Sequence, residues 1–179
     1  MMPVTTVTSL LDGTETLADE RRRFLDMLAL RPDSRLVESV GGSTGCPDES
    51  VDAVLCVDAI AHVRDRAAAL ADWARCVKTG GRILYTDPAI VAGLVTSEEL
   101  AILGSMGLFV FAPQGENEFL IESAGLRLLR ADDATDTIAL AAAKGRDRFD
   151  GRERVLEVVY RLASERRLAR IAFLAEKSR

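Results

Sequence analysis

The segment from Asp48 to Pro88 constrains the fold more than any other part of the chain. Its first part, SVDAVLCVDA, is apolar almost without interruption from Val51 to Val57, which is typical of a strand covered on both faces of a parallel sheet. The next part, VRDRAAALADWARCVKTGG, repeats apolar residues at helical spacing, and Gly80 and Gly81 predict the end of that helix. RILYTDP follows as a second strand. This order predicts a right-handed βαβ unit.

The rest of the chain predicts further elements around this unit. A capping pattern before Glu98 and Glu99 starts a helix near Ser97, and Gly125 ends a short helix. We expect helices in residues 14–30, from about 97, 116–125, 134–143 and 153–167, and further strands in residues 35–40, 126–133 and 169–176. Without a repeat or linker, residues 1–179 predict a single α/β domain.

Charge and cysteine content narrow the function classes. A formal net charge of -5 and a pI near 5.0 give no basic field for phosphate backbones, so we expect no nucleic-acid partner. Cys46, Cys56 and Cys76 lack metal-ligand spacing and are interpreted as reduced thiols without a metal. The first residues show no basic leader, and no apolar run approaches the roughly 20 residues of a membrane helix. We expect a cytoplasmic protein that does not enter membranes.

The motifs in this order resemble the class I S-adenosylmethionine-dependent methyltransferases that act on small molecules. Residues 48–88 are similar to the middle of that family: an Asp-containing strand, a His-containing loop, a crossover helix and a Lys-x-Gly-Gly turn into the next strand. NEFLIESAG before LRLLRADD and the ending RRLARIAFLAE match the later order of elements. LDMLALRPDSRLVESVGGSTG, residues 25–45, resembles the first helix, first strand and cofactor loop.

The first half of the family pattern is altered here. The family places an acid at the strand end and alternating glycines after it, whereas Glu38 is followed by SVGGSTG. CPDESVDAV then follows Gly45 almost at once. The resemblance therefore implies a Rossmann-like α/β sheet, mostly parallel with an antiparallel C-terminal strand, that lacks the second and third strands of the family.

The resemblance also implies a site. It assigns S-adenosylmethionine as the cofactor, and it places the following residues around it: Glu38, Gly41, Gly42, Gly45 and Asp58. In a parallel sheet the strand ends after Val57 and at Asp87 face ligands, so His62 is a candidate general base and Asp87 a second catalytic candidate. The same residues also suit purely structural roles. The glycines could form a turn left by a deletion, His62 could be a loop histidine hydrogen-bonded to backbone, and Asp87 could cap the segment that follows it.

These observations lead to one main function and two alternatives. We expect methyl transfer to a small-molecule hydroxyl, amine or carbon. The first alternative is a non-catalytic ligand-binding or interaction protein on the same fold, and the second is a repurposed isomerase or cyclase.

The strand at residues 35–40 is expected at a sheet edge, where unpaired backbone groups must be covered or paired. The β-branched residues of PVTTVTSLL, residues 3–11, suit such a cover. Alternatively, this segment swaps into a partner chain, or two such edges pair about a twofold axis, and we therefore expect a homodimer.

Overall fold

The computed structural model describes residues 15–105, 110–137 and 153–178. Its elements in chain order are α1 (Glu15–Met27), β1 (Leu36–Glu38), β2 (Val51–Cys56), the 3-10 turn η2 (Ile60–His62), α2 (Arg66–Cys76), β3 (Val77–Val91), α3 (Ser97–Gly104), β4 (Ala112–Pro113), α4 (Glu116–Ser123), β5 (Leu126–Asp133), α6 (Glu153–Ser164) and β6 (Leu168–Lys177). The predicted cover at residues 3–11 and most of the predicted helix at 134–143 lie outside the described residues.

One six-stranded sheet carries the fold, with the order β1-β2-β3-β6-β5 and β4 beside β3. The pairs β1–β2, β2–β3 and β3–β4 are parallel, whereas β6 is antiparallel to both β3 and β5. This confirms the predicted mostly parallel sheet with an antiparallel C-terminal strand. Among the described residues β1 pairs with β2 alone, so it is the edge strand that the sequence predicts.

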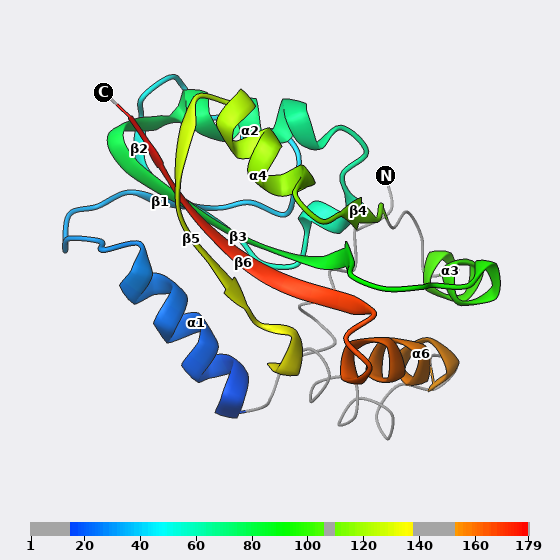
Figure 1. The fold of residues 1–179 in the computed structure, drawn as a ribbon. Coiled ribbons are helices and arrows are strands. Elements are labelled where there is room, and N and C mark those ends of the chain that lie inside the picture. The colour runs from blue at the N-terminus through cyan, green and yellow to red at the C-terminus, as the bar shows by residue number, and fades with distance from the viewer. Residues whose placement is uncertain (1–14, 106–109, 138–152, 179) are drawn as a thin grey trace.

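Helices cover both faces of the sheet (Figure 1): α1 lies on one face, and α2 and α4 lie on the other. Side chains alternate along each strand, so Leu84 of β3 packs with Phe24 of α1, whereas the next residue, Tyr85, packs with Trp73 of α2. Trp73 is fully buried, as predicted. Covering both faces explains why β2 and β3 are so continuously apolar.

The βαβ unit forms as predicted, but its helix ends earlier. The Asp65 side chain caps α2 by accepting from the Ala68 backbone N–H at 2.9 Å. The helix ends at Cys76 and β3 starts at Val77, so the prediction that Gly80 and Gly81 end the helix is wrong. Both glycines lie in an irregular stretch of β3, where a Cβ at Gly81 would come within 2.6 Å of a backbone carbonyl oxygen of β2.

The helices α3 and α6 pack against each other beyond the C-terminal end of β3 (Figure 1). They enclose a small apolar cluster that is separate from the two main cores. Leu103 of α3 and Leu162 of α6 are buried in it. No helix in the described part of the chain is both long and apolar enough to span a bilayer.

Candidate functional site

The carboxyl ends of β1, β2 and β3 lie along one edge of the sheet because the three strands are parallel. This edge, called the carboxyl edge below, brings together the three acids predicted from the sequence. Glu38 is the last residue of β1, Asp58 follows β2, and Asp87 lies near the end of β3. Their environments differ: the Glu38 side chain is 53% exposed, whereas Asp58 and Asp87 are fully buried.

Glu38 is paired with an arginine from α1. Arg21 donates from Nη1 to Oε2 of Glu38 at 3.2 Å, and its Nη2 donates to Oε1. Both side chains are about half exposed, at 49% for Arg21 and 53% for Glu38. The hydrogen bond to Glu38 raises the pKa of Arg21. The carboxylate therefore faces solvent with a guanidinium already bound to it.

The glycine loop after Glu38 passes directly over the turn that follows β2. Gly41 has φ +93°, and a Cβ there would lie 2.6 Å from Cγ2 of Val63 and 3.1 Å from the Ala59 carbonyl oxygen. Only glycine fits both that backbone conformation and that space. Gly42 and Gly45 also have positive φ, but a Cβ at either would meet nothing within 4 Å. The loop is thus packed at its first glycine and open at the other two.

The same loop is tied to α2. Oδ2 of Asp72 accepts from the Thr44 backbone N–H at 2.7 Å and from its hydroxyl at 2.9 Å, and Trp73 Nε1 donates to the Gly42 carbonyl at 3.1 Å. Residues 39–50 also connect β1 directly to the parallel strand β2, without the helix that such crossovers usually contain. The loop therefore leads into a strand, whereas a typical cofactor loop leads into a helix.

Asp58 lies on the α1 face of the sheet and is held from two strands. Its Oδ1 accepts from Thr86 Oγ1 of β3 and from Arg170 Nε of β6, each at 2.7 Å. Its Oδ2 is buried and has no hydrogen-bond partner among the described residues. The backbone of Asp58 also has a positive φ of 54°. These contacts fix the turn after β2, over which Gly41 passes.

Arg170 links Asp58 to α1. Its Nη1 and Nη2 donate to the two oxygens of Glu20 at 2.6 and 3.0 Å, and both side chains are buried. Burial alone would lower the pKa of Arg170, but the charges of Asp58 and Glu20 outweigh it and raise that pKa. Glu20, Arg170 and Asp58, called the buried cluster below, thus connect α1, β6 and the end of β2.

Asp87 points to the opposite face and is surrounded by donors. Its Oδ2 accepts from Arg66 at 2.5 Å and from Asn117 Nδ2 at 2.8 Å, while Oδ1 accepts from the Ala89 backbone N–H at 2.9 Å. Asn117 in turn accepts from the Tyr85 hydroxyl at 3.1 Å. The carboxylate therefore organises the start of α2 and α4 around the end of β3.

His62 and Cys56 complete the carboxyl edge. His62 ends η2 and is half-buried, on the connection between β2 and α2. Cys56 ends β2, and burial raises the pKa of its thiol to about 12. At neutral pH the thiol stays protonated, which excludes the thiolate that nucleophilic catalysis would need.

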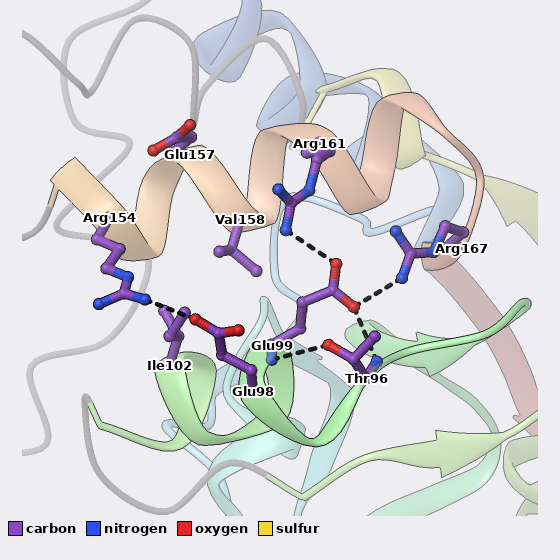
Figure 2. A pocket seen from close by; sticks show the side chains of 9 residues that line it. All are labelled: Thr96, Glu98, Glu99, Ile102, Arg154, Glu157, Val158, Arg161 and Arg167. Atoms are coloured by element: carbon purple, nitrogen blue, oxygen red, sulfur yellow. Dashed lines mark hydrogen bonds and ion pairs between the residues drawn. The ribbon is translucent and has the colours of Figure 1, made fainter.

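A pocket of about 490 Å³ lies between α3 and α6 (Figure 2), and its lining consists of Thr96, Glu98, Glu99, Ile102, Arg154, Glu157, Val158, Arg161 and Arg167. Glu99 accepts from Arg161 at 2.9 Å, from Arg167 at 2.6 Å and from the Thr96 backbone N–H at 2.8 Å.

The bond from Thr96, together with Arg167, lowers the pKa of Glu99 to about 2. Arg154 is paired with Glu98 at 2.7 Å. Each described arginine lining this pocket has a carboxylate partner, so among the described residues the pocket offers no uncompensated positive charge.

Three arginines that shape the carboxyl edge were not singled out from the sequence. Arg170 had a signal, because a charged residue interrupts the apolar strand ARIAFLAE. Arg66 directly follows the cap of α2, and Arg21 lies in the run RRR, so neither stood out from ordinary surface charge. In the described part of the chain, no group of His, Cys, Asp and Glu side chains could hold a metal ion.

Comparison with known protein families gives a match to a profile described as "Methyltransferase domain", over residues 11–85. The chain is 27% identical over 135 residues to 27-O-demethylrifamycin SV methyltransferase from Amycolatopsis mediterranei, covering 73% of this chain and 50% of that protein. It is 33% identical over 91 residues to dimethylglycine N-methyltransferase from Parasynechococcus marenigrum, covering 51% and 32%. The chain thus spans half or less of the curated relatives that it matches.

Among solved structures, the fold is similar to geranyl diphosphate C-methyltransferase from Streptomyces coelicolor. The TM-score is 0.77 at 11% identity, and the match covers 98% of this chain and 87% of that one. At this identity the likeness concerns the fold alone. It confirms the Rossmann-like methyltransferase fold that the sequence resemblance implied.

Proposed function

We propose that this methyltransferase-like chain, which has the class I fold, transfers a methyl group from S-adenosylmethionine to a small molecule at the carboxyl edge. One observation carries the proposal. The half-exposed carboxylate of Glu38 ends β1, and the loop that follows contains Gly42 and Gly45, where a Cβ would meet nothing within 4 Å. The Streptomyces coelicolor structure, described as a complex with S-adenosyl-L-homocysteine, supports the same cofactor.

The residues present fit the amino-acid end of this cofactor. Glu38 offers a carboxylate to an ammonium group, and the glycines let a ligand approach the backbone without a Cβ in between. In the described residues no strand lies beyond β1, so the acid that the family uses for the ribose has no counterpart there. When bound, the cofactor would supply an electrophilic methyl group on a sulfonium.

Asp58 and Asp87 would serve as positioning residues. Asp58 keeps the turn under Gly41 in place through Arg170, and its buried Oδ2 is not exposed to a ligand. Asp87 is buried and accepts from three donors, so it holds Arg66 and Asn117 rather than receiving a proton from a substrate. Both acids thus keep a role at the site without contact to the reacting atoms.

His62 is our candidate for the proton acceptor. It lies on the connection after β2, at the same edge as Glu38, and an imidazole can take a proton near neutral pH. The chain would bring the acceptor atom and the methyl group into line, and such positioning contributes strongly to catalysis.

Calorimetric titration with S-adenosylmethionine and S-adenosylhomocysteine tests the proposal. We expect micromolar binding by the wild type and about 10- to 100-fold weaker binding by Glu38→Gln, because a charge-assisted hydrogen bond is lost. Glu49→Gln is the matched control, since it removes the same charge at the far end of residues 39–50. Unchanged affinity in Glu38→Gln, or no heat up to millimolar ligand, would contradict the proposal.

We further propose that the sheet is shorter than that of the family, so that β1 becomes an outer strand. We also propose that two chains form a homodimer through the unpaired side of β1. Support comes from β1, which pairs on one side only among the described residues, and from Val40, which is 67% exposed beside it. Light scattering should give twice the mass of the chain, and a monomeric mass would exclude the dimer.

The free thiols Cys46, Cys56 and Cys76 support the cytoplasm as the compartment.

A further inference from the structure

The pair formed by Arg21 and Glu38, called the edge pair below, presents both charges of a small zwitterion site. Glu38 offers a carboxylate and Arg21 a guanidinium, in contact through two hydrogen bonds and each about half exposed. Any ammonium that approaches Glu38 therefore meets a bound guanidinium. A ligand that carries only an ammonium would have to displace Arg21 without offering it a new partner.

We propose that the edge pair recognises the amino-acid group of the ligand as a whole, with Glu38 taking the α-ammonium and Arg21 taking the α-carboxylate. This inference rests on the proposed function and adds Arg21 as a residue that determines specificity. The planar guanidinium can hold a carboxylate through two parallel hydrogen bonds, which a lysine cannot do.

The exchange of partners is favourable because the edge pair is exposed. Half-exposed ion pairs contribute little to stability, so opening this one costs the fold little. After the exchange each charge has a new opposite partner, and the site is neutral both before and after binding. A ligand without the carboxylate would leave Arg21 without a partner, and the site would discriminate against it.

The fold holds Arg21 in place for this role. Its neighbour Glu20 points toward the sheet and is bound by the buried Arg170 of β6, which fixes α1 against the sheet. The adjacent arginines have other partners: Arg22 pairs with Asp19 at 3.1 Å within α1, and Arg23 lies 3.8 Å from Glu20 and over the ring of Phe24. Arg21 is thus the α1 arginine directed at Glu38 in the described structure.

Calorimetry with two ligands separates this inference from simple cofactor binding. The ligands are S-adenosylhomocysteine and its decarboxylated analogue, in which a hydrogen replaces the α-carboxylate. We expect the wild type to prefer S-adenosylhomocysteine by about tenfold or more, and Arg21→Gln to reduce that preference to about threefold or less. Arg22→Gln, which removes the same charge one residue away, should keep the wild-type preference.

The outcomes distinguish the two proposals. If the wild type binds S-adenosylhomocysteine but shows no preference over the analogue, or if Arg21→Gln keeps the preference, the role of Arg21 is wrong and the proposed function stands. If neither ligand binds, both proposals fail. Arg21→Lys should give an intermediate preference, because it keeps the charge and loses the fork, whereas a purely structural role would not change the ratio between the ligands.

Discussion

Glu20 and Arg21 are neighbours in α1, and their ion pairs lie in opposite environments. Glu20 belongs to the buried cluster with Arg170 and Asp58, away from water, whereas Arg21 belongs to the edge pair with Glu38, in water. A buried pair cannot be broken without leaving a charge in a poorly polarisable interior, but an exposed pair can exchange its partner for a ligand or for water. Burial therefore makes one pair a fixed support and leaves the other free to act in binding.

The largest expected effect comes from breaking the buried cluster. Arg170→Met leaves buried Asp58 without a cation and buried Glu20 with only the longer contact to Arg23 at 3.8 Å, so we expect a loss of about 3–5 kcal/mol in the free energy of unfolding. Urea unfolding measures it. Arg130→Met is the control, because Arg130 is an exposed arginine on the neighbouring β5, paired with Asp132. A loss in Arg170→Met no larger than in the control would show that the cluster does not support the fold.

A third ion cluster, around Glu99 between α3 and α6, tests the intermediate case, since its carboxylate is buried and its two arginines are partly exposed (Figure 2). The pKa of Glu99 is about 2 in the folded protein and 4.5 for the ordinary group. Its contribution to stability is therefore complete above pH 4.5 and is lost as the pH falls toward 2.

Hydrogen exchange of the α3 backbone amides, expressed as protection factors, follows this loss. In the wild type we expect protection to fall on acidification from pH 6 to pH 3, and in Glu99→Gln to be low already at pH 6. Glu98→Gln is the control, because the Glu98 side chain is 75% exposed and, among the described residues, forms an ion pair with Arg154 only. Protection in Glu99→Gln equal to that of the wild type at pH 6 would contradict this account.

The smallest effect is expected at the edge pair. Arg21→Gln should change the free energy of unfolding by less than about 1 kcal/mol, and added salt should reduce the difference further. Urea unfolding at low and high salt measures both. A loss comparable to that of Arg170→Met would mean that the edge pair is structural, and its exchange with a ligand would then be too costly.

Much of the fold could be predicted because its signals are local. The run from Val51 to Val57 and the helical spacing of Leu70 and Trp73 are properties of short segments, and both elements formed as expected. The edge position of β1 followed from how soon β2 begins after Gly45. The end of α2 could not be read in this way, because Val77 turns into β3 by pairing with Val51 of the neighbouring strand.

The partners of the site residues could not be predicted, because they come from distant parts of the chain. Asp58 and Arg170 are 112 positions apart, and the sequence does not show which arginine will bind which acid. The positions of Glu38, Asp58 and Asp87 at one edge followed from strand order, whereas their burial did not. Arg21 was missed for the same reason, since its partner Glu38 lies on another element.

A crystal structure of the protein with S-adenosylhomocysteine would test the central claim most directly. The account predicts that the edge pair opens, that the α-ammonium lies within hydrogen-bond distance of the Glu38 carboxylate, and that the Arg21 guanidinium contacts the α-carboxylate, while Glu20 and Arg170 stay in contact. A ligand bound elsewhere, or bound at this edge with Arg21 and Glu38 still paired to each other, would contradict it.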